Sequence, residues 1–158
     1  MIKTEAIILK TADLNETGRL LTIYSEKLGK INIRAIGVKK LESKLRYSIE
    51  PISYVQFILV EGKNSLILKD AVLIDQFLNI KKDLGKIKIA GKLVDLIDEA
   101  IVGEEKDKDI WQLVLKTFQD IDNTESAFAE ASADKFEKKL IKLLGYDSDS
   151  TRSIKDLY

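Results

Sequence analysis

The residues best suited to a chemical task are basic side chains that crowd into one short stretch. Between Lys30 and Arg46 the sequence has six lysines or arginines and a single acid, Glu42. Ammonium and guanidinium groups neutralise phosphates and donate hydrogen bonds to their oxygens. A local basic cluster of this kind favours a nucleic-acid surface, and the alternative is a solvated, lysine-rich loop.

The chain as a whole is electrically balanced, so this cluster stands against a neutral background. The 158 residues contain 26 basic and 26 acidic side chains. Ten of the basic residues and five of the acids lie in residues 1–46, which therefore carry +5 and leave −5 to the remainder. If the chain binds a nucleic acid, the basic residues that contact it would thus lie in the first third of the chain.

Two residue types on which many enzymes depend are missing. The sequence has no cysteine, which excludes disulfides, thiol nucleophiles and thiolate zinc sites. It has no histidine, which excludes Ser-His-Asp triads and imidazole metal sites. Neither GxGxxG nor the phosphate-binding GxxxxGK[S/T] pattern is present. What remains is carboxylate, lysine or tyrosine chemistry, or binding without catalysis.

A group of acidic residues offers one catalytic alternative. Asp95 and Asp98 are three residues apart, and Asp95 and Glu99 are four apart, so each pair shares one face of a helix. Such carboxylates could hold magnesium or manganese in a metal-dependent hydrolase. The simpler interpretation is a solvated helix face.

The first half of the chain must position the basic cluster, and its pattern is that of short strands separated by turns. The expected strands are Thr4–Thr11, Arg19–Ser25, Lys30–Ile36, Ile52–Val60 and Ser65–Ile74. In the third of these, Ile31 and Ile33 alternate with Arg34, as in a strand with one buried face. Five strands in about 75 residues indicate a small barrel or sandwich, and an oligonucleotide-binding (OB) barrel has this strand count.

The last two expected strands are apolar on both faces, which suits the centre of a closed sheet. They contain Tyr54 and Phe57, two of the few aromatic residues near the basic cluster. Proteins that bind single strands stack bases on such rings. Because these strands are so apolar, we expect both rings to pack in the core instead.

The second half of the chain changes to a helical period. Three apolar stripes are expected: Leu84, Ile87, Ala90, Val94, Ile97 and Ile101; Ile110, Leu113, Val114, Thr117, Phe118 and Ile121; and Phe128, Ala131, Phe136, Leu140, Leu143 and Leu144. Asp83 is placed to cap the first helix, and Asp122–Thr124 to break the second and cap the third. Gly103 and Gly145 are natural helix ends. We expect a strand domain over 1–80 and an α-helical domain over 81–158 with a polar C-terminal tail.

The chain shows no targeting or membrane signal. No apolar run exceeds four residues, whereas a membrane helix needs about 20. Glu5 interrupts the N-terminus before the apolar core of a signal peptide could form. We therefore expect a cytoplasmic protein that does not bind membranes.

Five stretches follow one another in an order and spacing that is itself a signal. They are Glu5–Thr11, Asn15–Ser25, Leu28–Ile31 with Ala35–Lys40, Ser43–Arg46 followed by Pro51, and Phe136–Tyr146. In this order they resemble the RecO family of DNA repair and recombination-mediator proteins. The resemblance spans residues 1–146 and is strongest over 5–51.

The resemblance implies both a fold and a function. The fold is α+β, with an N-terminal five-stranded OB barrel joined to an α-helical domain. Family members bind single- and double-stranded DNA, promote strand annealing, and work with RecR and the single-stranded-DNA-binding protein to help RecA load. The resemblance implies no catalytic residue, metal or cofactor, and it implies association with the nucleoid when DNA is bound.

Carried over residue by residue, the resemblance also implies a DNA-binding surface. Its members are Arg19, Lys30, Arg34, Lys39, Lys40, Lys44 and Arg46. The chain departs from the family pattern at Asn15, where glycine is usual. It also lacks the four-cysteine zinc motif of many members and ends twelve residues after Tyr146, as expected of a short form.

A second function stays open beside DNA binding. The barrel could serve as a scaffold and the helical domain as a partner-binding surface, which would make the protein an interaction adaptor. Each expected helix has a single apolar face, and the sequence does not say which surfaces are left for a partner.

Overall fold

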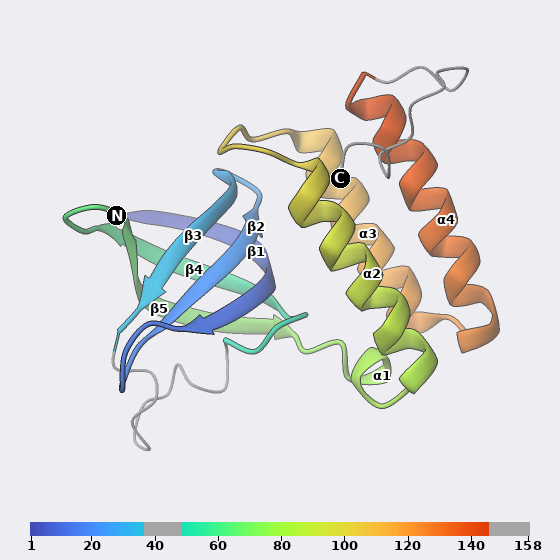
Figure 1. Ribbon diagram of the computed structural model, residues 1–158, viewed down its shortest axis with the longest axis horizontal. Coiled ribbons are helices and arrows are strands. Elements are labelled where there is room, and N and C mark those ends of the chain that lie inside the picture. Colours follow the sequence, from blue (N-terminus) through green and yellow to red (C-terminus); the bar gives the residue numbers. More distant parts are fainter. Residues whose placement is uncertain (37–48, 146–158) are drawn as a thin grey trace. The chain divides into compact units, whose positions relative to one another are not determined.

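In the computed structural model, which describes residues 1–36 and 49–145, strands and helices form two separate units (Figure 1). The first unit contains residues 1–76 and 103–106, and the second contains residues 77–102 and those from 107 onward. The chain first leaves this unit after residue 76, slightly before the boundary that we predicted after residue 80, and it returns to it for residues 103–106. The difference arises because Leu78–Lys81 forms a short helix, α1, which belongs to the helical unit.

The strands of the first unit close into a five-stranded barrel in the order β1-β2-β3-β5-β4. They are β1 Ile2–Asp13, β2 Arg19–Ser25, β3 Gly29–Ala35, β4 Tyr54–Glu61 and β5 Leu66–Asp75. All neighbouring strands are antiparallel except β3 and β5, which are parallel. The predicted fold class, an OB barrel followed by helices, is confirmed.

One long strand closes this barrel by pairing on both sides. The first part of β1 pairs with β4, from Ile2 opposite Leu59 to Ile7 opposite Tyr54. Its second part pairs with β2, and the register shifts between Ile8 and Lys10. Such a bulge bends and twists a strand locally, so that β1 can be shared between the two sides of the barrel.

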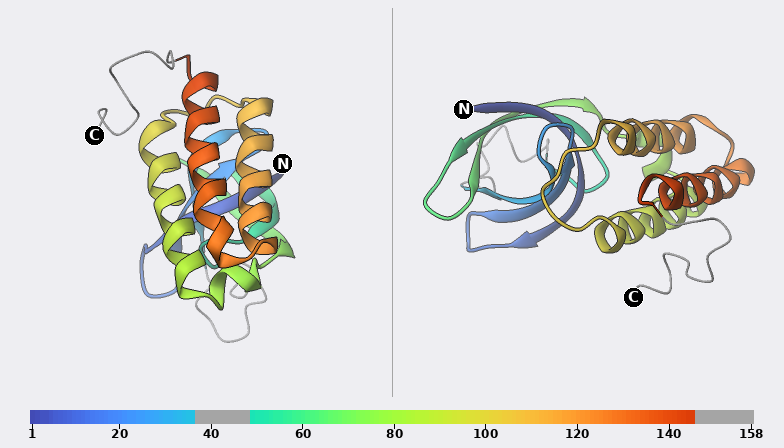
Figure 2. Two further views of the ribbon diagram at one scale, coloured as in Figure 1. Left: turned by 90° about the vertical axis from the view of Figure 1, so that its right-hand side faces the viewer. Right: turned by 90° about the horizontal axis from the view of Figure 1, so that it is seen from above.

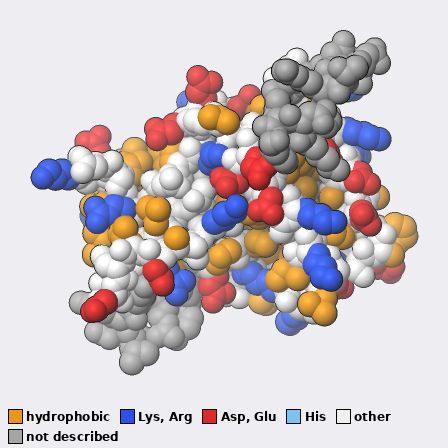
Figure 3. Space-filling model, in the orientation of Figure 1, with side chains coloured by type: hydrophobic (Ala, Val, Ile, Leu, Met, Phe, Trp, Pro, Cys, Tyr) orange, Lys and Arg blue, Asp and Glu red, His pale blue; other side chains and the backbone are white. Residues whose placement is uncertain are grey.

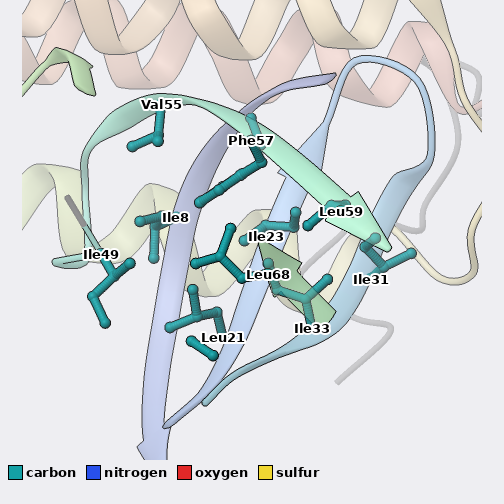
Figure 4. Close-up of a cluster of buried hydrophobic side chains, with 12 residues drawn as sticks. Ile8, Leu21, Ile23, Ile31, Ile33, Ile49, Val55, Phe57, Leu59 and Leu68 are labelled. Carbon is teal, nitrogen blue, oxygen red and sulfur yellow. The ribbon is translucent and has the colours of Figure 1, made fainter. Parts of the chain in front are cut away.

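The barrel interior is filled by aliphatic side chains and one aromatic ring (Figure 4). Ile31 and Ile33 point inward from β3 while Asn32 is exposed, which confirms the predicted alternation. Phe57 is fully buried in this core, also as predicted. The last two strands lie within a closed sheet as predicted, with a neighbour on each side. The outward side chains Val72 and Ile74 of β5 are nevertheless 56% and 45% exposed.

The second unit is a bundle of three long helices that follows α1 (Figure 2). The long helices are α2 Leu84–Ala100, α3 Lys108–Asn123 and α4 Ser126–Leu143. Asp83 caps α2 as predicted, because its side chain accepts a hydrogen bond from the Lys86 amide at 3.1 Å. No helix of the described residues is long and apolar enough to cross a membrane.

The predicted break between α3 and α4 is confirmed at Thr124 but begins later than Asp122, and the predicted cap of α4 is wrong. Helix α3 continues through Asn123, so Asp122 lies inside it rather than in a break. The residue that precedes α4 is Glu125, and its side chain makes no capping hydrogen bond. Asp122 instead turns into the bundle, where it has a structural task that the sequence pattern did not show.

Helical periodicity predicts the core side of α3 and part of the other two stripes, but Ile87, Ala131 and Leu143 are exposed, as are two residues near helix starts. The stripe on α3 is confirmed, with Val114 and Phe118 fully buried. Leu84 and Phe128 begin the other two stripes but are 78% and 60% exposed, since each lies in the first turn of its helix or next to it. Helix α1 has four residues, too few to show a period, and was not predicted.

Asp122 joins three helices through buried hydrogen bonds. Its side-chain Oδ1 accepts from the backbone amide of Ile80 in α1 at 3.1 Å. Its backbone carbonyl accepts from the ammonium group of Lys86 in α2, also at 3.1 Å. Asp122 and Lys86 are both buried, so water cannot easily replace these bonds.

We expect Asp122→Ala to lower the free energy of unfolding by about 1–3 kcal/mol, because the Ile80 amide loses its acceptor in a buried site. Asp122→Asn keeps the Oδ1 acceptor and should cost clearly less. Urea unfolding followed by circular dichroism measures both changes. Equal losses of unfolding free energy in the two variants would mean that the hydrogen bond accepted by Oδ1 does not account for the stabilisation.

Two glycines provide a matched pair for testing the backbone. Gly29, at the start of β3, has φ +70°, and a Cβ there would lie 2.5 Å from the Glu105 carbonyl oxygen. Gly29→Ala should therefore destabilise the protein by about 2 kcal/mol or more. A Cβ at Gly91, inside α2, would have open space for 4 Å around it, so Gly91→Ala should stabilise by about 0.5–1 kcal/mol. Thermal unfolding of both variants measures the two changes in stability. A stabilised Gly29→Ala or a destabilised Gly91→Ala would contradict the prediction.

Candidate nucleic-acid interface

The outer face of β2 and β3 is the part of an OB barrel that usually contacts oligonucleotides, together with the β1–β2 and β4–β5 loops. In β3 the outward side chains are Lys30, Asn32 and Arg34, because the residues between them face the core. They lie opposite Tyr24, Thr22 and Leu20 of β2, respectively. One strand therefore presents two basic groups and an amide in a single outward row.

The structure separates the predicted DNA-binding residues into three groups. Lys30 and Arg34 share the outer row of β3 and are both half-buried. Arg19 does not join them, because it alternates with Leu20 and falls in the inward row of β2, at the strand end opposite Asp13. The remaining four predicted residues, Lys39, Lys40, Lys44 and Arg46, lie outside the described residues.

Arg34 is held by aliphatic neighbours on both sides. In register, it lies between Leu20 of β2 and Ile67 of β5. Its Nε is shielded from solvent and has no hydrogen-bond partner among the described residues. An unpaired buried donor costs about 1–3 kcal/mol.

A row of polar residues that we did not predict crosses three strands beside Arg34. Lys10 of β1 lies opposite Thr22 of β2, which lies opposite Asn32 of β3. The Thr22 hydroxyl donates to Asn32 Oδ1 at 2.8 Å, and Lys10 is exposed. Strand alternation alone is enough to predict that Asn32 points outward. It does not predict that Lys10 lies opposite Thr22, because the bulge in β1 shifts the pairing register by one residue.

The β1–β2 turn is built by the residue that departs from the family pattern. Asn15 Oδ1 accepts hydrogen bonds from the amides of Thr17 at 3.0 Å and Gly18 at 2.6 Å. The Leu14 amide also donates to the Gly18 carbonyl at 3.1 Å. Asparagine thus closes this loop with its own side chain, so the departure from glycine keeps a compact turn beside β2.

A cavity of about 520 Å³ opens between β3 and the β4–β5 turn. It borders the part of β3 before Ile33, because β5 pairs with β3 only at Ile33 and Arg34. Its lining includes Asn32 but also the carboxylates Glu61 and Glu104. These negative charges oppose phosphate binding in the cavity.

Tyr54 is buried as predicted, although it does not lie in the barrel interior. Its neighbour Val55 fills the interior, so Tyr54 belongs to the outer side of β4. Its hydroxyl donates to Glu5 Oε2 at 2.6 Å. Burial, and then the bond to the Glu5 carboxylate, raise the pKa of Tyr54 well above its ordinary value. The ring is therefore a structural element and not a platform for bases.

Charges of both signs are mixed over the visible face of the molecule, with hydrophobic groups among them (Figure 3). On this face, the described residues form no extended patch of one sign. The acids that suggested a hydrolase do not form a metal site, because no three acidic residues within the described ranges are placed to hold a metal ion. Asp95 and Glu99 are exposed on α2.

Comparison with known proteins agrees with the barrel and with the order of its motifs. Residues 1–77 match the family described as Recombination protein O N terminal. The chain is 32% identical over 149 residues to the DNA repair protein RecO of Clostridium novyi, 34% over 146 to that of Clostridium perfringens, and 31% over 147 to that of Caldanaerobacter subterraneus. The chain is therefore similar to RecO proteins, and its barrel matches their N-terminal region.

The match to these RecO proteins covers most of the chain but only part of the relatives. It includes 92–94% of the chain and 58–59% of the relatives' length. The helical unit is therefore shared with them along with the barrel, since the aligned lengths extend far beyond residue 77. The resemblance first seen in five short stretches is confirmed over nearly the whole chain.

We expect Tyr54 to stay protonated when ordinary tyrosines ionise, at a pH of about 10. Since the pKa is raised in the folded state, its contribution to stability is complete below the unfolded value and is lost as pH rises above it. In Tyr54→Phe, this loss of stability at alkaline pH should be absent. Phenolate absorbance and unfolding free energies at alkaline pH test both statements. An identical alkaline loss of stability in the variant would contradict them.

Proposed function

We propose that this chain is a non-enzymatic DNA-binding protein of recombinational repair. It binds single- and double-stranded DNA, promotes the annealing of complementary strands and helps RecA to load, with RecR and the single-stranded-DNA-binding protein as partners. The supporting observation is the outward row of Lys30, Asn32 and Arg34 on the β2–β3 face of an OB barrel. Similarity to DNA repair proteins named RecO supports the same function.

The proposed mechanism is neutralisation of phosphates without any covalent step. Lys30 and Arg34 lie on one strand four residues apart, a distance of about 13 Å at the usual rise per residue. They can therefore contact phosphates of different nucleotides on one extended DNA strand. The basic residues at 39, 40, 44 and 46 extend this surface in the proposal. Lower repulsion between two bound strands would favour annealing.

Sequence preference should be weak. Tyr24 and Tyr54 are buried, and Phe57 is in the barrel core, so none of them offers a free face for base stacking. Proteins that recognise single strands through stacking gain about 1–3 kcal/mol per base. Without these rings, phosphate contacts dominate the binding free energy.

The proposal predicts salt-dependent binding of labelled single-stranded DNA in fluorescence anisotropy. If about four to six phosphates are neutralised, log affinity should fall with log salt at a slope of roughly −3 to −4. Lys30→Glu/Arg34→Glu should weaken binding by about tenfold or more for all sequences alike. Lys39→Glu/Lys40→Glu tests the remainder of the surface in the same assay.

The matched control is Lys108→Glu/Lys116→Glu, which makes the same change in net charge at two exposed lysines of α3. It should bind DNA almost as the parent protein does, and circular dichroism must show native folding in each variant. Annealing of complementary oligonucleotides should follow the order of DNA affinities. A slope near zero, or equal weakening in variant and control, would refute phosphate binding by the β2–β3 face.

A further inference from the structure

The helical unit contains a groove that DNA binding does not use. Helices α2 and α4 run side by side (Figure 2), and the groove between them has a volume of about 450 Å³. Its floor is apolar and consists of Ile89, Leu93 and Leu96 from α2 with Ala133 from α4. Leu93 is buried and the other three are half-buried, so apolar surface remains open along the groove.

The rim of this groove is acidic on both sides. Asp95 and Glu99 line it from α2, and Glu130, Asp134 and Glu137 line it from α4. Lys92 is the one basic residue of the lining, which leaves the groove with four more negative than positive charges. All of these acids are exposed except Glu137, which is half-buried.

The arrangement follows from helical spacing. On α4, Glu130, Asp134 and Glu137 are four and three residues apart, so their side chains lie along one face. Ala133 lies on the same side, and its small side chain leaves room that a larger residue would fill. On α2, Asp95 and Glu99 repeat the four-residue spacing opposite them.

We propose that this groove binds a basic amphipathic helix of a partner protein. An amphipathic helix places its apolar residues in a hydrophobic groove, and its i, i+3 and i+4 side chains act as anchors. Lysines or arginines beside those anchors would meet the acidic rim on both sides, which gives charge complementarity. The same rim repels phosphate, so the groove recognises a protein and not a nucleic acid.

A solvated helix face would explain exposed acids, but it does not explain the apolar floor between them. A metal site would explain the acids, but no group of three among the described residues is placed to ligate an ion. A basic helix accounts for both features, because its apolar stripe covers the floor and its charges pair with the rim. The inference gives the adaptor function a defined surface and does not depend on DNA binding by the barrel.

The test uses the full chain and a fluorescent model helix of about 18 residues, with leucines in one stripe and lysines on both flanks. Two control peptides have the same lysines with the leucine stripe scrambled, or glutamates in place of the lysines. Fluorescence anisotropy is measured at about 150 mM salt, where isolated surface charges are well screened. We expect the amphipathic basic peptide to bind at least about tenfold more tightly than either control peptide.

Protein variants then locate the binding site. Glu130→Lys/Asp134→Lys should weaken peptide binding by about tenfold, and the control Glu50→Lys/Asp120→Lys, with the same charge change at exposed acids outside the groove, by less than about twofold. Ala133→Glu adds negative charge but fills the groove, so it should also weaken binding. Tighter binding by Ala133→Glu would mean unspecific attraction and would overturn the proposal.

Other outcomes also decide the matter. Equal binding of the scrambled peptide, or no binding at about 100 µM peptide, would refute an amphipathic ligand. Self-association that disappears in Glu130→Lys/Asp134→Lys would assign the groove to a second copy of the chain instead. DNA affinity should be unchanged in the groove variants, so failure of this inference is distinguishable from failure of the DNA-binding proposal.

Discussion

The pairing of β1 with two different strands is the constraint on which the barrel depends. Its first residues pair with β4 and its later ones with β2, with Ala6 and Ile7 paired on both sides, and the bulge between Ile8 and Lys10 bends the strand just beyond this overlap. Without β1, no strand pairing would connect β4 with β2 on this side of the barrel, and the barrel would be open between them. The same bulge sets which residues of β1 face outward, and so it brings Lys10 beside Thr22 and Asn32.

Strand and helix periods were sufficient to predict the architecture because they are local properties. The strand Arg19–Ser25 was predicted residue for residue, and the alternation of Ile31 and Ile33 correctly oriented β3. Helix ends were harder to predict. Asp122 has the side chain of a capping residue, but its oxygen accepts from Ile80, which lies 42 residues away in the sequence. A sequence pattern read in windows of a few residues does not contain such a contact.

The candidate site was predictable only where strand alternation decided it. Arg34 was correctly placed on the outer face, whereas Arg19 was included by resemblance and lies in the inward row of β2. Lys10 was missed because its neighbours depend on a one-residue register shift. At Asn15 the sequence showed a departure from the family pattern but not what the asparagine does. Its side chain makes the turn bonds that keep the loop compact.

The neutral total charge of the chain conceals two local charges of opposite sign. The first 46 residues carry +5 and the rest carry −5, and the acidic groove of α2 and α4 accounts for much of the negative part. A uniformly basic protein would attract DNA over its whole surface and lose any distinction between its two units. Under the two proposals, a phosphate backbone would be attracted to the barrel and repelled by the groove, and a basic helix would have the opposite preference. In this view, charge segregation permits a DNA strand and a basic protein partner to bind the same chain without competing for the same residues.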